Sequence, residues 1–353
     1  MVSLQDIATI NPKSDPLQNT FIYIDLEAVE KGELRKIQEI MREEAPSRAQ
    51  RVIDNNDILF QCVRPYQKNN YIHRILNTSN QQWVASTGYA QIRTTELPNY
   101  IYHLLNTDEF NRKVMVRCTG SSYPAINSED LATIHLYYTP DKKEQLKISR
   151  LLDLLDKRIA TQNKIIEKLQ SLIKGIRVCC MQRVYGNNVY LSEIAQIYQP
   201  QTISSTELTE DGFLVYGANG IIGKYKDYNH ETEQICITCR GNTCGMVNYT
   251  KPMSWITGNA MVINTDKYQD KVCKRYLYHY LSAYNFNSII SGSGQPQIVR
   301  TPLEKLKITL PTISEQKQKA IIFDKIQDKI DINHKVLNLY IGQKQYLLRQ
   351  MFI

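Results

Sequence analysis

Three cysteines close together are the residues whose chemistry is easiest to judge. Cys236, Cys239 and Cys244 lie in one short segment, ICITCRGNTC. A structural zinc site would need a fourth ligand and a matching pair of cysteines or histidines. Residues 235–239 alternate like a β-strand, and isolated cysteines commonly pack as small apolar side chains. The pattern favours buried cysteines over a metal site, so we assign no metal ligand.

Motifs of known catalytic chemistry are missing or weak. The sequence has no G-x-x-x-x-G-K-[ST] phosphate loop. It also has no N-P-P-[FY] tetrad of the kind with which adenine methyltransferases hold a flipped base; the nearest segment, residues 11–14 (NPKS), does not fit. Pro140, Asp141 and Glu144 faintly resemble a metal-dependent nuclease motif, but the helix that follows them recurs later in the chain without that aspartate. We predict no catalytic residue.

The composition indicates a protein of two domains with packed cores. The chain has 353 residues, of which 42% are hydrophobic. No apolar run approaches the roughly 18 residues of a membrane span, and residues 1–12 lack the order of a signal peptide. The 8 cysteines do not look like a disulfide framework in a chain of this length. We therefore expect a cytoplasmic protein that does not bind membranes.

Positive charge is concentrated in two segments of the chain. Of the net charge of +8, residues 143–187 carry +6 and residues 313–353 carry +3, whereas residues 1–142 and 188–312 carry −2 and +1. Both basic segments have the apolar spacing of a helix. Their charge fits an acidic partner and a solvated helix face equally well.

The chain consists of two related halves. Any one short match within a sequence can be chance, but several matches in the same order indicate a duplication. The matched pairs are residues 4–10 (LQDIATI) with 191–197 (LSEIAQI), 86–90 (STGYA) with 256–260 (ITGNA), 120–126 (GSSYPAI) with 292–298 (GSGQPQI), and 144–145 (EQ) with 315–316 (EQ).

Each half has the same predicted plan. A short helix with the pattern LxxIAxI comes first, because its hydrophobic residues repeat with a period near 3.6. A mixed region follows, in which strand-like runs such as residues 57–63, 234–239 and 260–264 are separated by Gly, Asn and Pro turns. A long helix closes each half. The predicted fold class is α/β (α+β), with domains at residues 1–142 and 188–312 and long helices at residues 143–187 and 313–353.

Heptad spacing is the clearest structural signal in both helices. Apolar residues step by four and three, as in the seam of a coiled coil, and one amide interrupts each seam, Gln162 in the first and Asn333 in the second. In antiparallel helices these two amides would meet and hydrogen-bond each other, whereas a slipped register would bury them unpaired. They could also be unrelated polar residues on separately packed helices. The seam residues are Ile148, Leu152, Leu155, Ile159, Ile166, Leu169, Ile173 and Ile176, then Phe323, Ile326, Ile330, Leu337, Tyr340 and Leu347.

An antiparallel pair of helices would set the two domains apart. Some 30 helical residues make a rod of about 45 Å, and antiparallel helices carry their preceding domains to opposite ends. We therefore expect a dumbbell with pseudo-two-fold symmetry. Its domains would be separated by a little over one turn of B-DNA, which is roughly 34–36 Å.

These features together resemble the specificity (S) subunit of type I restriction–modification systems, over essentially the whole chain. The matching pieces are the two LxxIAxI starts, residues 216–223 (YGANGIIG) of the second half, the loops at 120–126 and 292–298, and the helices that begin with Glu-Gln. Each motif alone is weak. Their order, found twice, is specific.

The resemblance implies a DNA-binding subunit with no catalytic activity of its own. Each target-recognition domain would read one half of a bipartite site in double-stranded DNA, and the helices would set the spacer and dock two modification (methyltransferase) subunits. S-adenosylmethionine would bind to the modification subunits, while ATP and magnesium would serve the restriction subunits that translocate and cleave DNA. The chain itself would need no cofactor.

The first half departs from the family pattern in two places. Residues 20–26 (TFIYIDL) replace the YGANGIIG opening, and Tyr123 stands where the second loop has Gln295. The two halves should therefore read different sequences, which makes the predicted site asymmetric.

Polar and basic loop residues are the predicted DNA contacts. Lysine and arginine bind phosphates, and arginine, asparagine, glutamine and serine bind base edges. Arg64 and Arg240 take matching places after strand-like runs, although each could be an ordinary surface charge, and the nearby glycines could simply make tight turns. The candidates are Arg64, Lys68, Arg74, Ser86, Thr87, Tyr89, Ser121, Ser122 and Tyr123 in the first domain, and Tyr216, Asn219, Lys224, Tyr225, Arg240, Ser291, Ser293, Gln295 and Gln297 in the second.

A protein scaffold is the alternative function. A coiled coil that carries two peptide-binding domains would explain the heptads but not the duplicated polar loops. An enzyme has no supporting set of residues. Binding to duplex DNA in the presence of an adenine methyltransferase would distinguish the DNA reader from the scaffold.

Overall fold

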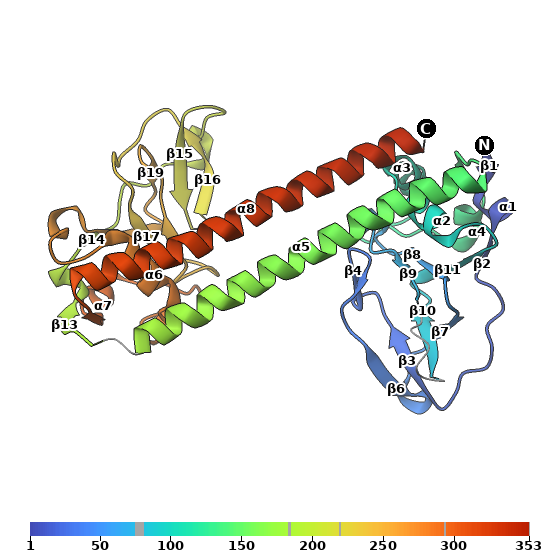
Figure 1. The fold of residues 1–353 in the computed structure, drawn as a ribbon, viewed down its shortest axis with the longest axis horizontal. Coiled ribbons are helices and arrows are strands. Elements are labelled where there is room, and N and C mark those ends of the chain that lie inside the picture. Colours follow the sequence, from blue (N-terminus) through green and yellow to red (C-terminus); the bar gives the residue numbers. More distant parts are fainter. Residues whose placement is uncertain (75–80, 183–184, 219, 293, 353) are drawn as a thin grey trace. The chain divides into compact units, whose positions relative to one another are not determined.

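The computed structural model of the chain describes residues 1–74, 81–182, 185–218, 220–292 and 294–352 (Figure 1). It divides into two compact units, of which the first is Met1–Asn163 with Lys335–Ile353 and the second is Lys164–His334. Each unit therefore contains one mixed α/β domain and one half of each long helix. In the described part of the chain no helix has the length and apolarity that a membrane span requires.

Two four-stranded sheets form the domain of the first unit. Their strand orders are β6-β3-β10-β7 and β2-β11-β8-β9, and β1-β12 and β4-β5 are two-stranded. The strands are β1 (Val2–Ser3), β2 (Ala8–Ile10), β3 (Thr20–Ile24), β4 (Val29–Glu30), β5 (Glu33–Leu34), β6 (Gln38–Met41), β7 (Ala49–Ile53), β8 (Ile58–Gln61), β9 (Tyr71–Ile72), β10 (Gln82–Ser86), β11 (Tyr89–Thr94) and β12 (His135–Leu136). The helices are α1 (Leu4–Ile7), α2 (Pro98–Leu105), α3 (Asp108–Arg117) and α4 (Ser128–Ala132), with short 3-10 helices at Arg42–Glu44 and Pro65–Gln67.

The second unit contains a smaller set of sheets. Their orders are β16-β15-β19, β14-β20-β17-β18 and β13-β21. The strands are β13 (Asn187–Tyr190), β14 (Gln196–Tyr198), β15 (Phe213–Gly217), β16 (Gly220–Tyr225), β17 (Ile235–Thr238), β18 (Val247–Tyr249), β19 (Trp255–Ile256), β20 (Ala260–Asn264) and β21 (Lys307–Leu310). The helices are α6 (Lys274–Ala283) and α7 (Arg300–Glu304), with 3-10 helices at Leu191–Glu193, Ser205–Glu207, Asp266–Tyr268 and Phe286–Ser288.

The two domains share their sheet order. The order β2-β11-β8-β9 corresponds to β14-β20-β17-β18, and β6-β3-β10 corresponds to β16-β15-β19. In each domain the strands of one pair run parallel, β3 with β10 and β15 with β19. The strand-like runs predicted at residues 57–63, 234–239 and 260–264 are β8, β17 and β20. The duplication predicted from four short matches is confirmed, and the first domain adds β7 and the β4–β5 hairpin.

At the start of each domain, only the first half of the LxxIAxI segment is helical, although its pattern predicts a helix throughout. Helix α1 ends at Ile7, and β2 then pairs with β11, so that Ile10 faces Ile92 in the sheet. In the second domain a 3-10 turn at Leu191–Glu193 precedes β14. The prediction of one short helix was wrong in its second half, because pairing with a neighbouring strand overrides a helical period that is supported over only two turns.

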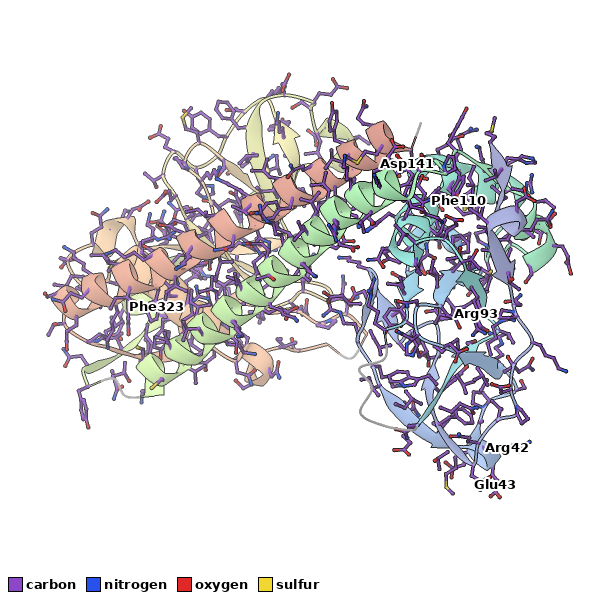
Figure 2. The ribbon with its side chains drawn as sticks, turned by 45° about the vertical axis from the view of Figure 1, so that its right-hand side comes forward. Arg42, Glu43, Arg93, Phe110, Asp141 and Phe323 are labelled. Carbon is purple, nitrogen blue, oxygen red and sulfur yellow. The ribbon has the colours of Figure 1, made fainter. Side chains whose placement is uncertain are left out.

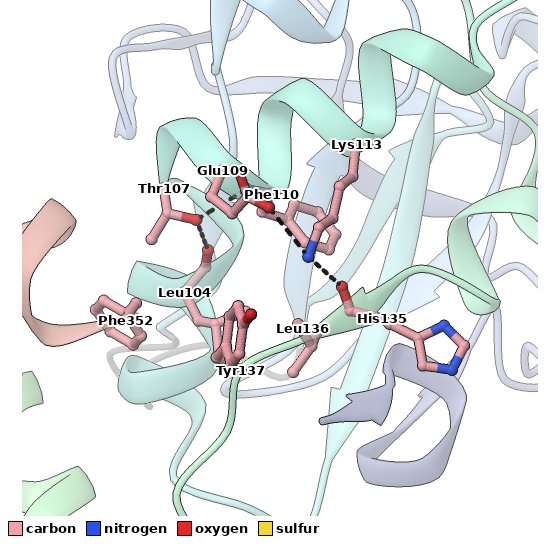
Figure 3. A pocket seen from close by; sticks show the side chains of 9 residues that line it. All are labelled: Leu104, Thr107, Glu109, Phe110, Lys113, His135, Leu136, Tyr137 and Phe352. Carbon is pink, nitrogen blue, oxygen red and sulfur yellow. Dashed lines mark hydrogen bonds and ion pairs between the residues drawn. The ribbon is translucent and has the colours of Figure 1, made fainter.

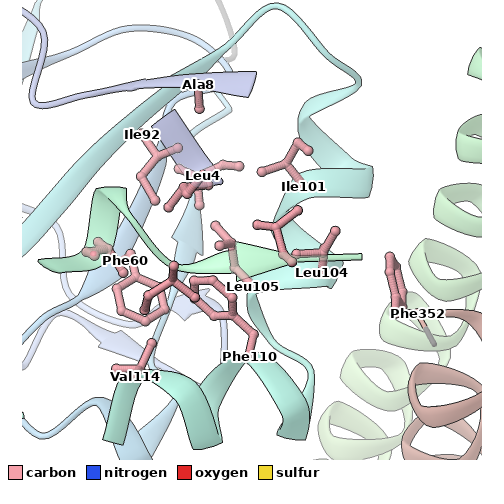
Figure 4. Packing of buried hydrophobic residues seen from close by; sticks show 14 of the residues in the cluster. Leu4, Ala8, Phe60, Ile92, Ile101, Leu104, Leu105, Phe110, Val114 and Phe352 are labelled. Atoms are coloured by element: carbon pink, nitrogen blue, oxygen red, sulfur yellow. The ribbon is translucent and has the colours of Figure 1, made fainter. Parts of the chain in front are cut away.

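One apolar core joins the first domain to the ends of both long helices (Figure 4). Phe60 and Phe110 meet edge-on within it, with ring centroids 5.8 Å apart. The α5 side chain of Leu152 is fully buried in the same cluster. Phe352, at the end of α8, packs there with its ring centroid 5.2 Å from that of Tyr100. Burial of these large apolar side chains is what attaches the domain to the helices.

The two long helices are α5 (Lys142–Gln182) and α8 (Ile313–Met351), which have 41 and 39 residues. Both helices continue beyond the roughly 30 residues of the regular heptad seam. The predicted seam is confirmed as the inward face. Ile148, Leu152, Leu155, Ile166, Ile173, Phe323 and Ile330 are buried, and Ile159, Leu169, Ile176, Ile326, Leu337, Tyr340 and Leu347 are half-buried.

The helix halves in the first unit run antiparallel. Lys344 Nζ of α8 lies 2.5 Å from Asp156 Oδ1 of α5. One half-turn further along α5, the guanidinium of Arg158 lies 5.7 Å from the ring centroid of Tyr340, which is one turn back along α8. The contacts therefore advance in opposite directions on the two helices, as the sequence predicted.

The helix halves in the second unit make their own apolar contact. Ile173 of α5 forms a buried cluster with Phe323 and Ile330 of α8, which lie two turns apart (Figure 2). Gln162 in the first unit is buried, and Asn333 in the second is half-buried and donates a hydrogen bond to a carbonyl on its own helix. Their pairing as a register lock stays a prediction.

The Glu-Gln pair that opens each long helix has two roles. Glu144 accepts a hydrogen bond of 2.6 Å from the Thr139 hydroxyl, and Gln145 is fully buried and donates one of 2.8 Å to the Thr139 carbonyl. Glu315 and Gln316 repeat both bonds at the start of α8. In both copies the glutamate binds a threonine hydroxyl and the buried glutamine binds a backbone carbonyl of the segment that enters the helix, so the pair fixes that segment.

A buried histidine–aspartate pair joins each domain to a long helix. His103 on α2 places Nε2 2.8 Å from Asp153 Oδ1 on α5, and His279 on α6 places Nε2 2.7 Å from Asp324 Oδ1 on α8. Both rings are 0% exposed. The pairs occupy the same place in the two copies, so they belong to the structure that both copies share.

His279 is the centre of a longer chain of hydrogen bonds. Its Nδ1 lies 2.7 Å from a guanidinium nitrogen of Arg177, which can only donate, so Nδ1 accepts and Nε2–H donates to Asp324. Burial lowers the pKa of His279 to about 4, and the nearby Arg177 and Arg275 oppose a charged ring as well, although Asp324 favours one. The ring is therefore neutral at neutral pH.

The neutral state of His279 predicts a pH dependence of stability. Its pKa is about 4 in the folded chain and about 6.5 in an unfolded one, so the unfolded state binds more protons between these values. The stability that the neutral ring contributes is complete above about pH 6.5 and is lost as the pH falls toward 4, by up to about 3 kcal/mol. Thermal unfolding of the wild type should lose stability with falling pH more steeply than that of His279→Gln, and equal slopes would contradict the assignment.

Candidate nucleic-acid interface

A tight loop precedes the last strand of the second domain. Ser291 and Gln297 exchange two backbone hydrogen bonds, of 2.9 and 2.8 Å, and so close the loop. Gly292 begins it with a φ of +94°, and a Cβ there would meet the Gln295 carbonyl oxygen at 2.4 Å. Only glycine fits this turn. The side chains of Ser291, Gln295 and Gln297 are exposed.

Backbone hydrogen bonds hold this loop to the end of β17. Ile298 N–H donates to the Cys239 carbonyl at 3.0 Å, and Gly241 N–H donates to the Pro296 carbonyl at 3.0 Å. Arg240 between them forms a β-bridge with the loop and has an exposed side chain. The structure thus brings together the predicted contacts of the loop and the predicted arginine.

Ala218, which follows the end of β15, joins the same region. The carbonyl of Ala218 accepts hydrogen bonds from two threonine hydroxyls, Thr238 at 2.6 Å and Thr243 at 3.0 Å. Thr238 ends β17, and Thr243 lies in the turn that follows it. One region of the second unit therefore gathers Ala218, the turn after β17, and residues 291, 292 and 294–297. We call it the second loop cluster.

The first domain repeats this arrangement. Thr119 and Ala125 exchange two backbone hydrogen bonds of 2.9 Å each, and Gly120 begins the loop with a φ of +89°. Arg64 N–H donates to the Pro124 carbonyl at 2.7 Å. Arg64 and residues 119–125 form the first loop cluster, which has the same backbone frame as the second.

The structural counterpart of Arg64 is Gly241, not Arg240. Arg64 and Gly241 both donate the N–H that binds the proline carbonyl of the loop, whereas Arg240 takes the place of Val63 in the β-bridge to the loop. The predicted match of the two arginines was therefore wrong by one residue. The two arginines occupy successive positions of the shared backbone frame, and Arg64 has a left-handed backbone, so they are not equivalent readers.

Three predicted contacts are buried instead of exposed. Ser86 and Tyr89, on either side of the turn between β10 and β11, are 3% and 0% exposed, and Tyr216 in β15 is 5% exposed. Ser86 Oγ accepts from the Gly88 N–H at 3.2 Å, and the Tyr216 hydroxyl accepts from the Lys251 N–H at 3.2 Å. As surface contacts these predictions were wrong, because the polar side chains satisfy backbone groups inside their domains.

Three basic candidates have partners within their own domains. Lys68 lies 2.8 Å from Asp108, and Lys224 lies 3.0 Å from Asp211. Arg74 donates a hydrogen bond to the Asn99 side chain. The Lys224 pair is largely exposed, so it stabilises the fold little and leaves the lysine accessible to a phosphate.

The remaining candidates differ in exposure. Tyr225 packs edge-on against Trp255, with ring centroids 5.0 Å apart, so its ring supports β16. Asn219 and Ser293 lie outside the described residues. Ser121, Ser122 and Tyr123 are exposed, and Thr87 is half-buried.

The cysteines of the second domain are core residues. Cys236 and Cys239 are 0% and 1% exposed and belong to two apolar clusters. Burial raises the pKa of the Cys236 thiol to about 12 and raises that of Cys239 as well. The predicted role as small buried side chains is confirmed for both. Among the described residues no group of three or more histidine, cysteine or acidic side chains is placed to hold a metal ion.

A small cavity lies where the core of the first unit meets its surface, since the exposed side chain of Tyr137 is part of its lining (Figure 3). Leu104, Phe110, Leu136 and Phe352 line it, and Lys113 donates a hydrogen bond of 3.0 Å to a backbone carbonyl beside it. Its volume is about 10 Å³, which is room for about one water molecule. The cavity is a packing defect and not a ligand site.

The family of the chain follows from a comparison with family models. The model described as "Type I restriction modification DNA specificity domain" matches residues 1–171 and 187–339, which is most of the chain. The chain belongs to this family. One matched segment covers each of the two repeated halves, and the resemblance drawn from the sequence motifs is confirmed.

Curated members of the specificity family match parts of the chain. The type I restriction enzyme EcoprrI specificity subunit of Escherichia coli is 31% identical over 147 residues, which are 40% of this chain and 36% of that protein. The type I restriction enzyme HindI specificity subunit of Haemophilus influenzae is 23% identical over 167 residues, which are 46% and 33%. The chain spans about a third of the length of the curated relatives it matches.

Solved structures of the specificity family match the whole chain. The S subunit of a type I restriction–modification system from M. genitalium superposes with a TM-score of 0.69 at 15% identity, over 100% of this chain and 95% of that one. A chain from a study of complex assembly and conformational transition of the type I R-M system superposes with a TM-score of 0.60 at 20% identity, over 99% and 96%. At these identities the likeness shows the fold, and the predicted class of two mixed α/β recognition domains with two long helices is confirmed.

Proposed function

We propose that this chain is the sequence-specific DNA-binding subunit of a type I restriction–modification complex, and that each recognition domain reads one half of a bipartite site. One observation carries the proposal. The two loop clusters are closed by the same backbone hydrogen bonds but present different side chains. Base recognition needs side chains on a rigid frame, and an asymmetric site needs a different set in each half.

The chain contributes recognition and no chemistry. The weak nuclease-like motif supports this assignment, because its carboxylates serve the start of α5. Asp141 accepts a hydrogen bond of 2.8 Å from the Lys143 N–H, and Glu144 accepts one from Thr139 (Figure 2). Methyl transfer with S-adenosylmethionine would belong to the modification subunits, and translocation and cleavage with ATP and magnesium to the restriction subunits.

The long helices are the docking surface for two methyltransferase subunits. On α8 in the first unit, Leu339 and Tyr346 lie one heptad apart and are 72% and 63% exposed. On α5 in the second unit, Ile165 and Leu172 lie one heptad apart and are 38% and 50% exposed, and Leu172 borders an open groove at Gly175. Exposed apolar residues at heptad spacing are suited to receive another helix. Ile332 of α8, one heptad before Leu339, is 58% exposed as well, so each long helix carries its own exposed apolar row, which supports two copies of a partner.

The proposal is tested by the binding of duplex DNA in the presence of the methyltransferase subunits from the same source. Methylated adenines in the source genome, compared with and without this gene, would supply the site. We expect the complex to bind a duplex with that site and to discriminate against one with the same bases in shuffled order. If no methylated motif depends on the gene and no duplex is bound, the proposal fails and the peptide-binding scaffold is favoured instead.

Two exposed residues of the second loop cluster should matter for affinity. Arg240→Ala and Gln295→Ala should each weaken binding of the complex to the cognate duplex by about 5- to 100-fold, because one lost base or phosphate contact has roughly that effect. The loss at Gln295 should depend on the sequence of one half-site only. Lys267→Ala, an exposed lysine of the same unit outside the cluster, is the control and should change affinity by less than about twofold. Unchanged site discrimination in both cluster variants would contradict the assignment.

A further inference from the structure

One backbone position in both loop clusters is left-handed. Gly241 binds the proline carbonyl of the second loop with a φ of +84°, and Arg64 makes the same bond in the first loop with a φ of +55°. A Cβ built on Gly241 would meet nothing within 4 Å. The position therefore has room for a side chain, and only its left-handed backbone favours glycine. That conformation is less favourable for any residue with a side chain than for glycine.

The backbone conformation alone does not mark Arg64 as a functional residue. Among the described residues, five others with side chains share this left-handed backbone, Asn11, Lys31, Asn56, Lys68 and Met253, so what distinguishes Arg64 is the surroundings of its guanidinium. The guanidinium of Arg64 lies 4.3 Å from the ring centroid of Tyr123, in the middle of the first loop, and that ring is 63% exposed. The ring fixes the direction of an otherwise flexible side chain.

The guanidinium of Arg64 contacts the Tyr123 ring but forms no ion pair with the residues that the structure describes, so its charge is not neutralised. Among the described residues its guanidinium has this ring contact and neither a hydrogen-bond acceptor nor a carboxylate. Two other arginines are neutralised instead, since Arg93 is bound to Asp57 and Arg275 to Asp324. A guanidinium stacked on a ring keeps its in-plane N–H donors free for a partner that approaches from the side.

We infer that Arg64, oriented by Tyr123, is the residue of the first recognition domain that selects a guanine in its half-site, an inference that rests on the proposed function. A fork of two N–H donors matches the O6 and N7 acceptors that guanine presents in the major groove. The second domain has Gly241 and Gln295 at the same two positions. The guanine contact therefore belongs to one half of the site.

The test compares variants of the full chain, in complex with its methyltransferase subunits, on a library of randomised duplexes. The wild-type complex should select a motif with a guanine at one fixed position. Arg64→Gly should lose that guanine preference, bind the wild-type motif about 10- to 100-fold more weakly, and keep every other preference. Its melting temperature should not fall, because the glycine relieves the left-handed backbone and keeps the N–H bond to the loop.

Lys31→Gly is the matched control. Lys31 is exposed, lies in the same domain and also has a left-handed backbone, with a φ of +51°. Its replacement removes the same charge and the same strain at a site outside the first loop cluster. The selected motif should therefore be unchanged, and the affinity should stay within about twofold of that of the wild type.

Conservative variants separate the base contact from simple charge. Arg64→Lys keeps the charge but lacks the planar fork of donors, so its affinity for the wild-type motif should lie between those of the wild type and Arg64→Gly, with a weaker guanine preference. Tyr123→Phe keeps the ring and should retain the preference, whereas Tyr123→Ala should weaken it.

Three results would overturn the inference. An unchanged motif for Arg64→Gly refutes the guanine contact while the proposed function stands. An equal loss of affinity on all sequences, with a lower melting temperature, assigns Arg64 to structure or to a phosphate. A wild-type complex that selects no motif refutes the proposed function and this inference together.

Discussion

Replacing Asp324 with alanine is expected to destabilise the second unit by about 2–4 kcal/mol. The carboxylate accepts hydrogen bonds from the buried ring of His279 at 2.7 Å and from Arg275 at 3.0 Å. Without it, a buried N–H donor and a half-buried guanidinium lose their partner. Removal of one member of a fully buried pair costs about 3–5 kcal/mol. The expected loss is smaller because the Asp324 and Arg275 side chains are 27% and 34% exposed.

The protonation state of Asp324 supports this expectation. Burial raises the pKa of its carboxyl, but the hydrogen bonds from Arg275 and His279 outweigh burial and leave the pKa below its ordinary value. The group is therefore charged at neutral pH and attracts the guanidinium of Arg275. Since its folded pKa is depressed, the stability that it contributes is present at neutral pH and is lost only in acid, below its unfolded pKa.

Thermal unfolding measures the Asp324→Ala effect, with two controls on the same helix. The variant should melt roughly 5–12 °C below the wild type. Asp324→Asn keeps an oxygen acceptor for His279 and should lose less. Asp328→Ala removes an exposed carboxylate one turn further along α8 and should change the free energy of unfolding by less than about 0.5 kcal/mol. Equal losses at positions 324 and 328 would show that the pair does not hold the domain on the helix.

The two long helices were predictable because the heptad pattern that indicates them extends over many turns. An a/d pattern over many turns has one simple structural explanation, and Leu152, Ile173 and Ile330 lie buried where the seam places them. The pattern LxxIAxI covers only two turns, so it could not show that Ile10 pairs with a strand. A period is informative in proportion to its length.

The histidine–aspartate pairs had a signal in the sequence that was missed. Residues 100–105 (YIYHLL) and 276–281 (YLYHYL) repeat the pattern Y-x-Y-H-x-L, with the histidine at the same place. That repeat could have identified His103 and His279 as frame residues. The sequence could not identify their partners, because an aspartate on a helix 45 to 50 residues away has no local mark.

The loop residues were predictable as a group but not one by one. Matched glycines and prolines revealed the two loops, because Gly120 and Gly292 both need a left-handed turn. The register between the copies was not visible, since a strand pattern does not show where its hydrogen-bonded ladder ends. The sequence pattern therefore pairs Arg64 with Arg240 and the glycines of STGYA and ITGNA with each other, whereas in the ladder Gly88 corresponds to Asn259. Errors of one residue exchange the two faces of a strand, which is enough to misplace a base contact.

Replacing Leu339 with aspartate is expected to release one methyltransferase subunit and to leave the chain folded. Leu339 is 72% exposed, so a polar residue there should change the free energy of unfolding by less than about 0.5 kcal/mol. In a docked complex the same side chain would be buried. The variant would then lose about 1.5–3 kcal/mol of apolar burial and would add a desolvated carboxylate, so affinity for that subunit should fall more than about 100-fold.

Because there are two exposed heptad pairs, the number of bound methyltransferase subunits is the quantity to measure. The wild type should carry two methyltransferase subunits in native mass spectrometry, Leu339→Asp and Leu172→Asp should each carry one, and the double variant should carry none. Asn338→Asp adds the same charge beside Leu339 at an exposed polar position, so it should still carry two. Loss of both subunits from either single variant would mean that the partners bind as one cooperative unit. Loss of neither would show that the methyltransferase subunits do not bind to this face of the helices. Because the two pairs lie on different helices and in different units, independent loss is the result that a duplicated docking surface requires.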